Sequence, residues 1–207
     1  MSKIEFNNLD GMHIDMLSEI GNIGAGNANT SLSQLLNKRI DMDVPLVKIT
    51  DFDEIAQVLG GPENLVVGIL VHVSGDVEGM MILAIEQTSA HKLVNMLLGR
   101  DLDNFESFTE IDLSALCEIG NILVSSYLSA LSAITKLSIQ PSVPYLAIDM
   151  AGAILSVPAI EFGKIDDKVL LIKTEFLEGV DSVLGNYILL PDEPSFNKIL
   201  TSLGAVL

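Results

Sequence analysis

The chain lacks tryptophan altogether, has a single cysteine, Cys117, and carries few basic residues. A solitary cysteine excludes an internal disulfide framework and a zinc site built from several cysteines, and it is typical of a reducing compartment. The 11 Lys and Arg residues stand against 28 Asp and Glu residues, which gives a formal net charge of −17. A field of that sign repels polyanions. We therefore expect no nucleic-acid partner.

Long hydrophobic runs are also missing, although the mean hydropathy is +0.46. The longest uncharged stretches, residues 20–37 and 119–135, carry polar residues or Gly on one side. Neither offers the roughly 20 predominantly apolar residues that cross a bilayer. The N-terminus lacks the continuous apolar segment of a signal peptide. With 49% hydrophobic residues, we expect a folded, cytoplasmic protein without membrane insertion.

The sequence repeats itself at an offset of 99 residues. The pentapeptide Glu-Ile-Gly-Asn-Ile occupies residues 19–23 and again residues 118–122. Two flanking features recur at the same offset: a polar residue four positions before the Glu, and a proline after 22 residues that follow the Asn. They are Asp15 and Ser114, and Pro45 and Pro144. The sequence therefore predicts an internal repeat of two halves, about 1–105 and about 106–207.

Each half continues with β-type segments and then a helix that ends in Leu-Gly. The expected elements are strands at 66–73 and 77–85 with a helix at 89–98, then strands at 169–176 and 186–190 with a helix at 194–203. Adjacent strands have hairpin-length connections, which indicate antiparallel pairing. No Pro/Gly/Ser-rich linker separates the halves. We expect one α+β domain, a pseudo-two-fold duplication with a largely antiparallel sheet and two long helices exposed on one side.

The two long helices are expected at about 12–37 and 112–136, where apolar residues recur every three or four positions. A polar line runs along the opposite side of each helix. It contains Asp15, Glu19, Asn22 and Gly26 in the first helix, and Ser114, Glu118, Asn121 and Ser125 in the second. Gly21, Gly24 and Gly26 would each cost an exposed helix about 1 kcal/mol relative to Ala. They indicate close backbone approach to the sheet or to a partner.

A Glu and an Asn one turn apart are, in a single copy, usually no more than a solvated helix face. Solvation does not require the same two residue types twice, however. The neighbouring residues have diverged, since Gly-Ala-Gly-Asn-Ala follows the first pentapeptide and Leu-Val-Ser-Ser-Tyr follows the second. We therefore interpret Glu19 with Asn22, and Glu118 with Asn121, as two copies of a site.

A carboxylate can pair with a cation, whereas a carboxamide can hold a water molecule without bringing a charge. That neutrality suits work beside a phosphoryl group, which a further carboxylate would repel. Phosphoryl transfer depends mainly on positioning and charge stabilisation, and an amide that orients the attacking water is one known solution. The sequence has no evident metal cage, so any Mg²⁺ would come with the substrate.

The pattern Asp/Ser-x-x-x-Glu-x-x-Asn-x(22)-Pro resembles that of the CheC-type phosphatases of chemotaxis, the CheC/CheX/FliY family, and the resemblance covers essentially the whole chain. It implies a protein phosphatase, a hydrolase of two-component signalling that dephosphorylates the aspartyl phosphate of the response regulator CheY. Asn22 or Asn121 would orient the attacking water. Glu19 or Glu118 would anchor the regulator through its conserved lysine. The regulator would bring the Mg²⁺, and the chain would need no cofactor of its own.

The same resemblance implies a second partner, the receptor deamidase CheD. Because the chain stops just after its last Leu-Gly helix, we expect a stand-alone form without a flagellar-switch domain. Other motif positions are expected to contact the docked regulator: Asp15, Gly26, Ser114 and Ser125. Pro45 and Pro144 are expected to be structural, each ending a segment that leads into a strand.

Other chemistries have weaker support. The Gly-x-x-Gly-x-Gly pattern at residues 21–26 lies within an expected helix, follows no strand and lacks Gly-Lys-Ser/Thr, so it is a poor phosphate loop. No spacing supports a thiol–imidazole pair between Cys117 and His13, His72 or His91, and a buried thiol is the simpler reading. The histidines are too scattered for a convincing metal site.

One alternative from another class stays open. The same helices could serve only for docking, in a non-catalytic module that binds phosphorylated CheY or acts as a flagellar-switch adaptor and regulates CheD. Such a module has no need for both Asn side chains, so their presence favours the enzyme.

Overall fold

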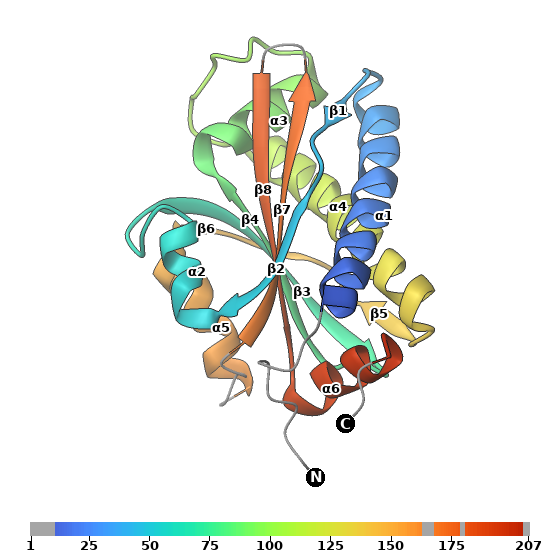
Figure 1. The fold of residues 1–207 in the computed structure, drawn as a ribbon. Coiled ribbons are helices and arrows are strands. Elements are labelled where there is room, and N and C mark those ends of the chain that lie inside the picture. Colours follow the sequence, from blue (N-terminus) through green and yellow to red (C-terminus); the bar gives the residue numbers. More distant parts are fainter. Residues whose placement is uncertain (1–10, 163–167, 179–180, 205–207) are drawn as a thin grey trace.

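The structure is a computed structural model that describes residues 11–162, 168–178 and 181–204 (Figure 1). Both halves have the same order of elements: helix, two strands, helix, two strands, helix. The first half contains α1 (Gly11–Leu36), β1 (Asp41–Met42), β2 (Leu46–Asp51), α2 (Phe52–Val58), β3 (Leu65–Gly75), β4 (Gly79–Glu86) and α3 (Gln87–Leu98). The second contains α4 (Glu110–Thr135), β5 (Ile139–Pro141), β6 (Tyr145–Met150), α5 (Ala151–Phe162), β7 (Lys168–Glu178), β8 (Asp181–Pro191) and α6 (Glu193–Ser202).

The described strands form one sheet in the order β1-β7-β8-β4-β3-β5, in which every pairing is antiparallel. Strand β2 of the first half lies along β7 of the second, and β6 of the second half lies along β3 of the first. The two halves thus exchange their N-terminal strands, while β4 and β8 pair at the centre of the sheet.

The central strands are apolar on both faces because both faces are covered. In β4, Met81, Leu83 and Ile85 belong to one buried cluster, whereas the alternate residues belong to a second cluster on the other face. Side chains alternate across a strand, and a strand buried on both faces therefore shows a continuous apolar run. This explains why the sequence of β4 reads Gly-Met-Met-Ile-Leu-Ala-Ile-Glu.

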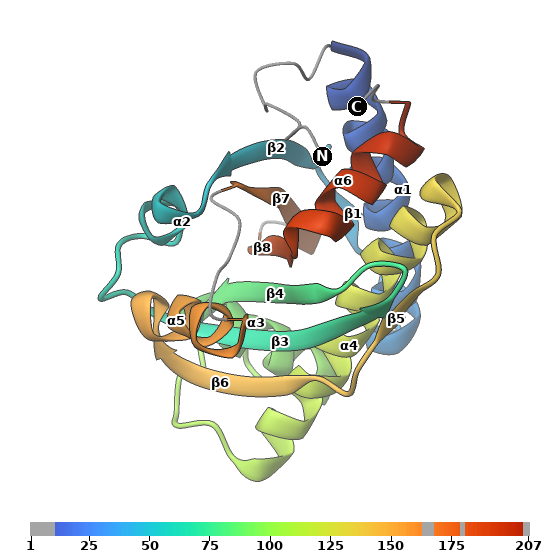
Figure 2. The ribbon, with the colours of Figure 1, turned by 90° about the horizontal axis from the view of Figure 1, so that it is seen from below.

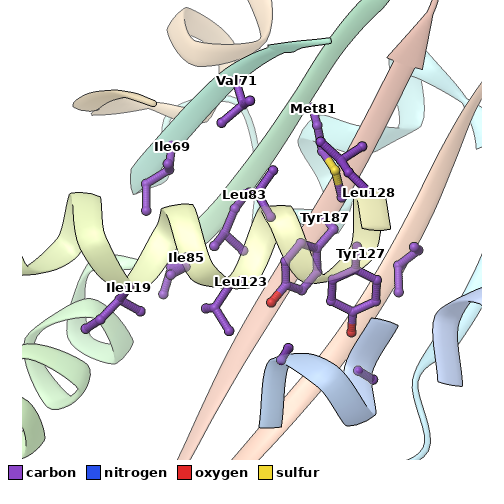
Figure 3. Close-up of a cluster of buried hydrophobic side chains, with 14 of the residues drawn as sticks. Ile69, Val71, Met81, Leu83, Ile85, Ile119, Leu123, Tyr127, Leu128 and Tyr187 are labelled. Atoms are coloured by element: carbon purple, nitrogen blue, oxygen red, sulfur yellow. The ribbon is translucent and has the colours of Figure 1, made fainter. Parts of the chain in front are cut away.

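The long helices α1 and α4 lie side by side on one face of the sheet, and the short helices α2 and α5 cover the other face (Figures 1 and 2). The larger of the two buried clusters lies between the sheet and helices α1 and α4. There the rings of Tyr127 from α4 and Tyr187 from β8 lie beside each other (Figure 3). Their centroids are 4.2 Å apart. The hydroxyl of Tyr127 forms a hydrogen bond of 2.5 Å with that of Thr174. Burial raises the pKa of Tyr127 to about 12.

The segment that joins the two halves is tied down at the start of α4. Thr109 caps α4 in a reciprocal capping box with Asp112. The Asp112 carboxylate also accepts a hydrogen bond of 2.7 Å from Nη1 of Arg100, which follows α3. His91 of α3 stacks on Phe108 at a centroid distance of 3.8 Å. These contacts fix where α4 begins, and therefore where its outward residues lie.

The expected α+β class, the antiparallel sheet and the two long helices are confirmed. The helix predicted at 89–98 ends as predicted, with Gly99 in the left-handed region at φ +65°. The strand predicted at 186–190 is longer and begins at Asp181. The strands expected after Pro45 and Pro144 are confirmed as β2 and β6, although their bounds had not been predicted. Four other elements had not been predicted: α2, α5, β1 and β5.

One expectation about membrane segments needs correction. Helix α4 is long and apolar enough to cross a bilayer by length and composition alone, with a mean hydropathy of 1.3 over its most apolar window. In the structure, however, residues such as Leu116, Leu123 and Leu131 are buried in the core shared with the sheet and α1. A buried core helix accounts for this composition without a membrane.

Candidate functional site on helices α1 and α4

The residues predicted as a site lie on the sides of α1 and α4 that face away from the sheet. On α1, Glu19 and Asn22 are both exposed, whereas the neighbouring Ile20 is 1% exposed. On α4, Glu118 is exposed and Asn121 is half-buried. The helix period explains this separation, because the apolar stripe is held against the sheet and turns the polar line outward.

The flanking predicted residues follow the same lines. Asp15, Gly26 and Ser114 are exposed and Ser125 is half-buried. The hydroxyl of Ser114 donates to the carbonyl of Glu110 one turn earlier, at 3.0 Å. The structure thus brings each set of predicted residues onto one outward line, and the two lines are carried by neighbouring helices.

The Glu and Asn side chains of both pairs have no bonded partner among the residues that the structure describes. Within residues 11–162, 168–178 and 181–204, no hydrogen bond or ion pair involves the side chains of Glu19, Asn22, Glu118 or Asn121. Neither helix contains Lys or Arg. The carboxylates therefore lack an internal counter-cation on their own helices, and a cation supplied by a partner is the natural complement.

The spacing from Asn to Pro, which is the same in both halves, has a structural counterpart in the first copy. Pro45 is buried just before β2, and a Cβ added to Gly21 would lie 3.6 Å from Cγ of Pro45. The same added atom would overlap Cγ2 of Val47 in β2. The glycine between Glu19 and Asn22 thus lies directly on the strand that follows Pro45. The second proline, Pro144, is half-buried and precedes β6.

The other two glycines of α1 have different surroundings. A Cβ on Gly24 would lie 2.5 Å from Cδ1 and 3.0 Å from Cα of Tyr127, so this glycine lets α1 and α4 approach each other. A Cβ on Gly26 would meet nothing within 4 Å. The predicted close approaches thus go to the sheet at Gly21 and to the second helix at Gly24, and Gly26 stays open.

The remaining candidates of the sequence do not converge on a site. Cys117 is half-buried on α4, and burial raises the pKa of its thiol, which disfavours the reactive thiolate. His72 lies on β3, with Nε2 3.3 Å from Oε2 of Glu161, and His91 lies beside Phe108. The side chain of His13 lies outside the described residues. No three His, Cys, Asp or Glu among the described residues are placed to hold a metal ion.

Two residues that support the site were missed from the sequence. Val47 and Ile69, on β2 and β3, lie under the glycines of the two pentapeptides, Gly21 and Gly120. The only sequence signal for Ile69 is its place in an apolar strand, and that for Val47 is its place in the strand expected after Pro45. The glycine in each pentapeptide was the sequence feature that could have indicated a side chain of the sheet packed closely against the helix.

A family model described as the CheC-like family matches the chain twice, at residues 12–49 and 111–148. The CheY-P phosphatase CheC of Bacillus subtilis (strain 168) is 36% identical over 206 residues, which cover 98% of this chain and 99% of that protein. The flagellar motor switch phosphatase FliY of the same organism is 31% identical over 141 residues, 68% of this chain and 36% of FliY.

Solved structures share the fold. FliY of Thermotoga maritima matches with a TM-score of 0.73 at 23% identity, over 94% of this chain and 99% of that one. The middle domain of FliM from H. pylori matches with a TM-score of 0.71 at 15% identity, over 94% and 99%. These two likenesses establish the architecture, and the sequence identity over nearly the full length establishes the kinship. The chain belongs to the CheC-like family.

Proposed function

We propose that this protein is a phosphatase that hydrolyses the aspartyl phosphate of a CheY-type response regulator in chemotaxis. One observation carries the proposal: two uncommitted Glu–Asn pairs, repeated at one spacing, stand on the outward sides of neighbouring helices. The names of its relatives support the choice of substrate, since CheC and FliY of Bacillus subtilis are a CheY-P phosphatase and a flagellar motor switch phosphatase.

The proposed chemical step is an in-line hydrolysis. The water oxygen attacks phosphorus, the bond from phosphorus to the Asp carboxylate oxygen breaks, and inorganic phosphate and a free carboxylate are released. Asn22 or Asn121 accepts a hydrogen bond from the water through Oδ1 and fixes its direction. An amide is too weak a base to take the proton, which leaves with phosphate or solvent. The role is therefore positioning, and it brings no negative charge near the phosphoryl oxygens.

Glu19 and Glu118 have the complementary role of docking. An exposed carboxylate without an internal cation partner can form an ion pair with a lysine of the regulator, which places the adjacent Asn at the phosphorylated Asp. The Mg²⁺ belongs to the regulator in this proposal and neutralises the phosphoryl oxygens there. The outward residues around each pair, Asp15 and Gly26 on α1 and Ser114 and Ser125 on α4, extend the docking surface.

The test is phosphate release from phosphorylated CheY with four proteins: the wild type, Asn22→Ala, Asn121→Ala and the double variant. Each single variant is expected to lose the part of the phosphatase activity that its own site contributes. The double variant should fall to the regulator's own rate of hydrolysis while it still binds the regulator. Comparison of the single variants also measures whether the exposed Asn22 and the half-buried Asn121 contribute equally. A double variant with wild-type turnover would refute the assignment.

The non-catalytic adaptor is the competing outcome of the same assay. It would be indicated if the wild type bound phosphorylated CheY and protected it from hydrolysis. The family also makes CheD a proposed partner in the cytoplasm, and co-elution of the two purified proteins would test this. Co-elution with CheD would not by itself test the phosphatase assignment.

A further inference from the structure

The Glu-Ile-Gly-Asn-Ile pentapeptides share a feature that the phosphatase proposal does not use. In both copies, the glycine between Glu and Asn is buried against a strand of the sheet. At about 100° per residue, Gly21 lies about 160° round the helix from Glu19 and about 100° from Asn22, so it is turned away from the outward line, and Gly120 has the same relation to its pair on α4.

The space at each glycine is filled from the sheet. A Cβ on Gly21 would overlap Cγ2 of Val47, which is itself 8% exposed. A Cβ on Gly120 would overlap Cδ1 of Ile69 and would lie 2.8 Å from Cγ2 of that residue, which is fully buried. These are methyl groups of β-branched residues in paired strands, so they have little freedom to turn away.

Close approach to a strand distinguishes Gly21 from the other two glycines of α1, since Gly24 approaches Tyr127 of α4. Gly26, one turn further along α1, would accept a Cβ without any contact within 4 Å. Glycine costs a helix interior about 1 kcal/mol relative to Ala. A general need for flexibility would not explain why two helices carry that cost at the same place and fill the vacated space with a strand side chain each time.

We propose that Gly21 and Gly120 are positioning residues, which set how closely each helix lies on the sheet and thereby hold the adjacent Asn at the correct depth for the attacking water. This inference rests on the phosphatase function proposed above. Replacement by Ala has to move the helix by about 1 Å before Cβ and the strand methyl reach ordinary contact. A misplacement of that size can reduce the rate of a positioned reaction about 100-fold.

The first copy allows a compensating substitution. With Val47→Ala, the overlapping methyl is gone, and the nearest atoms to a Cβ at position 21 are Cγ of Pro45 at 3.6 Å and Cβ of residue 47 at 3.8 Å. Both are ordinary van der Waals distances. The double variant Gly21→Ala/Val47→Ala therefore has room for the helix to keep its native depth.

The experiment isolates one site by placing every variant in an Asn121→Ala background, where turnover depends on Asn22. The kcat and KM for phosphorylated CheY are measured for four proteins: the background, Gly21→Ala, Val47→Ala and both together. We expect Gly21→Ala to lower kcat at least 10-fold with KM within threefold. Addition of Val47→Ala should then return kcat to within threefold of the value for Val47→Ala alone. Circular dichroism and thermal unfolding check that each variant is folded.

Each outcome decides the inference. If Gly21→Ala lowers the unfolding temperature but leaves kcat unchanged, the glycine is only a packing residue and the inference is wrong, while the phosphatase proposal stands. Failure of Val47→Ala to restore kcat also refutes it. If Gly21→Ala does not fold, the mirrored set in the second copy decides instead. A wild type without phosphatase activity overturns both proposals. The mirrored set, Gly120→Ala with Ile69→Ala in an Asn22→Ala background, repeats the test in the second copy.

Discussion

Replacement of Asp112 by Asn would remove one buried charge from the start of α4 and leave the shape of the side chain unchanged. The Asp112 side chain is 5% exposed. It accepts hydrogen bonds of 2.8 Å from both the backbone N–H and the hydroxyl of Thr109, and one of 2.7 Å from Arg100. A hydrogen bond to a charged group contributes about 1.5–3 kcal/mol, and breaking a buried pair costs about 3–5 kcal/mol.

The expected loss lies toward the lower end of these values. Arg100 is 36% exposed along its side chain and can turn to water once its partner is neutral. Asn at position 112 can still accept one bond from Thr109. We expect Asp112→Asn to lower the free energy of unfolding by about 2–3 kcal/mol at pH 7. Urea denaturation followed by circular dichroism measures this directly.

The pH dependence gives the prediction a second check. Burial alone would raise the pKa of Asp112, but the hydrogen bonds from Thr109 and Arg100 and the charge of Arg100 outweigh it and lower this pKa below its ordinary value. A carboxyl whose pKa falls on folding stabilises the protein above its unfolded pKa, near 3.9, and loses that contribution as the pH falls through the folded value. The difference between wild type and variant should therefore be full at pH 7 and shrink below about pH 4.

A matched control is available at the start of α6. Asp192 also caps a helix, and its side chain accepts a bond of 2.8 Å from the N–H of Ser195, but no Arg pairs with it in the described structure. Because Asn and Asp are equally good N-caps, Asp192→Asn should change stability by less than about 0.5 kcal/mol. The reasoning would be refuted if both variants lost the same stability, or if the loss in Asp112→Asn did not depend on pH.

Three further predictions concern stability and association. Gly24→Ala should lower the unfolding temperature because its Cβ would lie 2.5 Å from Cδ1 of Tyr127. Gly26→Ala should raise the unfolding temperature through a gain of up to about 1 kcal/mol in helix propensity. The opposite order of unfolding temperatures would contradict the packing of α1 on α4. Burial outweighs the nearby Asp112 charge and lowers the pKa of His91. The free energy of unfolding should therefore fall as the pH drops below about 6.5. Urea titrations between pH 7.5 and about 5.5 should show that His91→Phe removes this pH dependence. The net charge of −17 opposes approach to an acidic phosphorylated pocket, so the association rate with phosphorylated CheY should rise with salt in stopped-flow measurements; a rate that does not depend on salt would argue against this.

Much of the architecture could be predicted because the relevant sequence signals are local. The spacing of Leu17, Ile20 and Leu32 predicts which side of α1 is buried, and these residues are 2%, 1% and 0% exposed. The hairpin between β3 and β4 follows from the turn at residues 74–76 between two apolar runs. Exposure of the Glu–Asn lines followed from the same helical period. Their chemical roles remain predictions.

The features that were missed have weak local signals. Helix α5 is apolar nearly all round and contains Pro158, so it shows neither amphipathic spacing nor the usual absence of proline. For β6 the sequence predicted only a strand after Pro144 and not which of its faces is buried, because its Tyr145, Ile148 and Met150 are all exposed. The pairing of β2 and β6 with strands of the other half depends on contacts at least 75 residues apart in sequence, which local periodicity and propensity cannot encode.

The exchanged strands have a consequence for synthesis on the ribosome. Strand β2 pairs with β7, which begins 117 residues after the last residue of β2 (168 − 51 = 117). The edge of β2 that pairs with β7 therefore stays unpaired while most of the remaining polypeptide is translated. Nascent molecules cut short after α3 would leave three strands without a partner, since β2 pairs with β7, β3 with β6 and β4 with β8. Such open edges can pair with the edges of neighbouring truncated copies. Premature termination in this gene should therefore yield intermolecular association rather than a soluble half-size monomer.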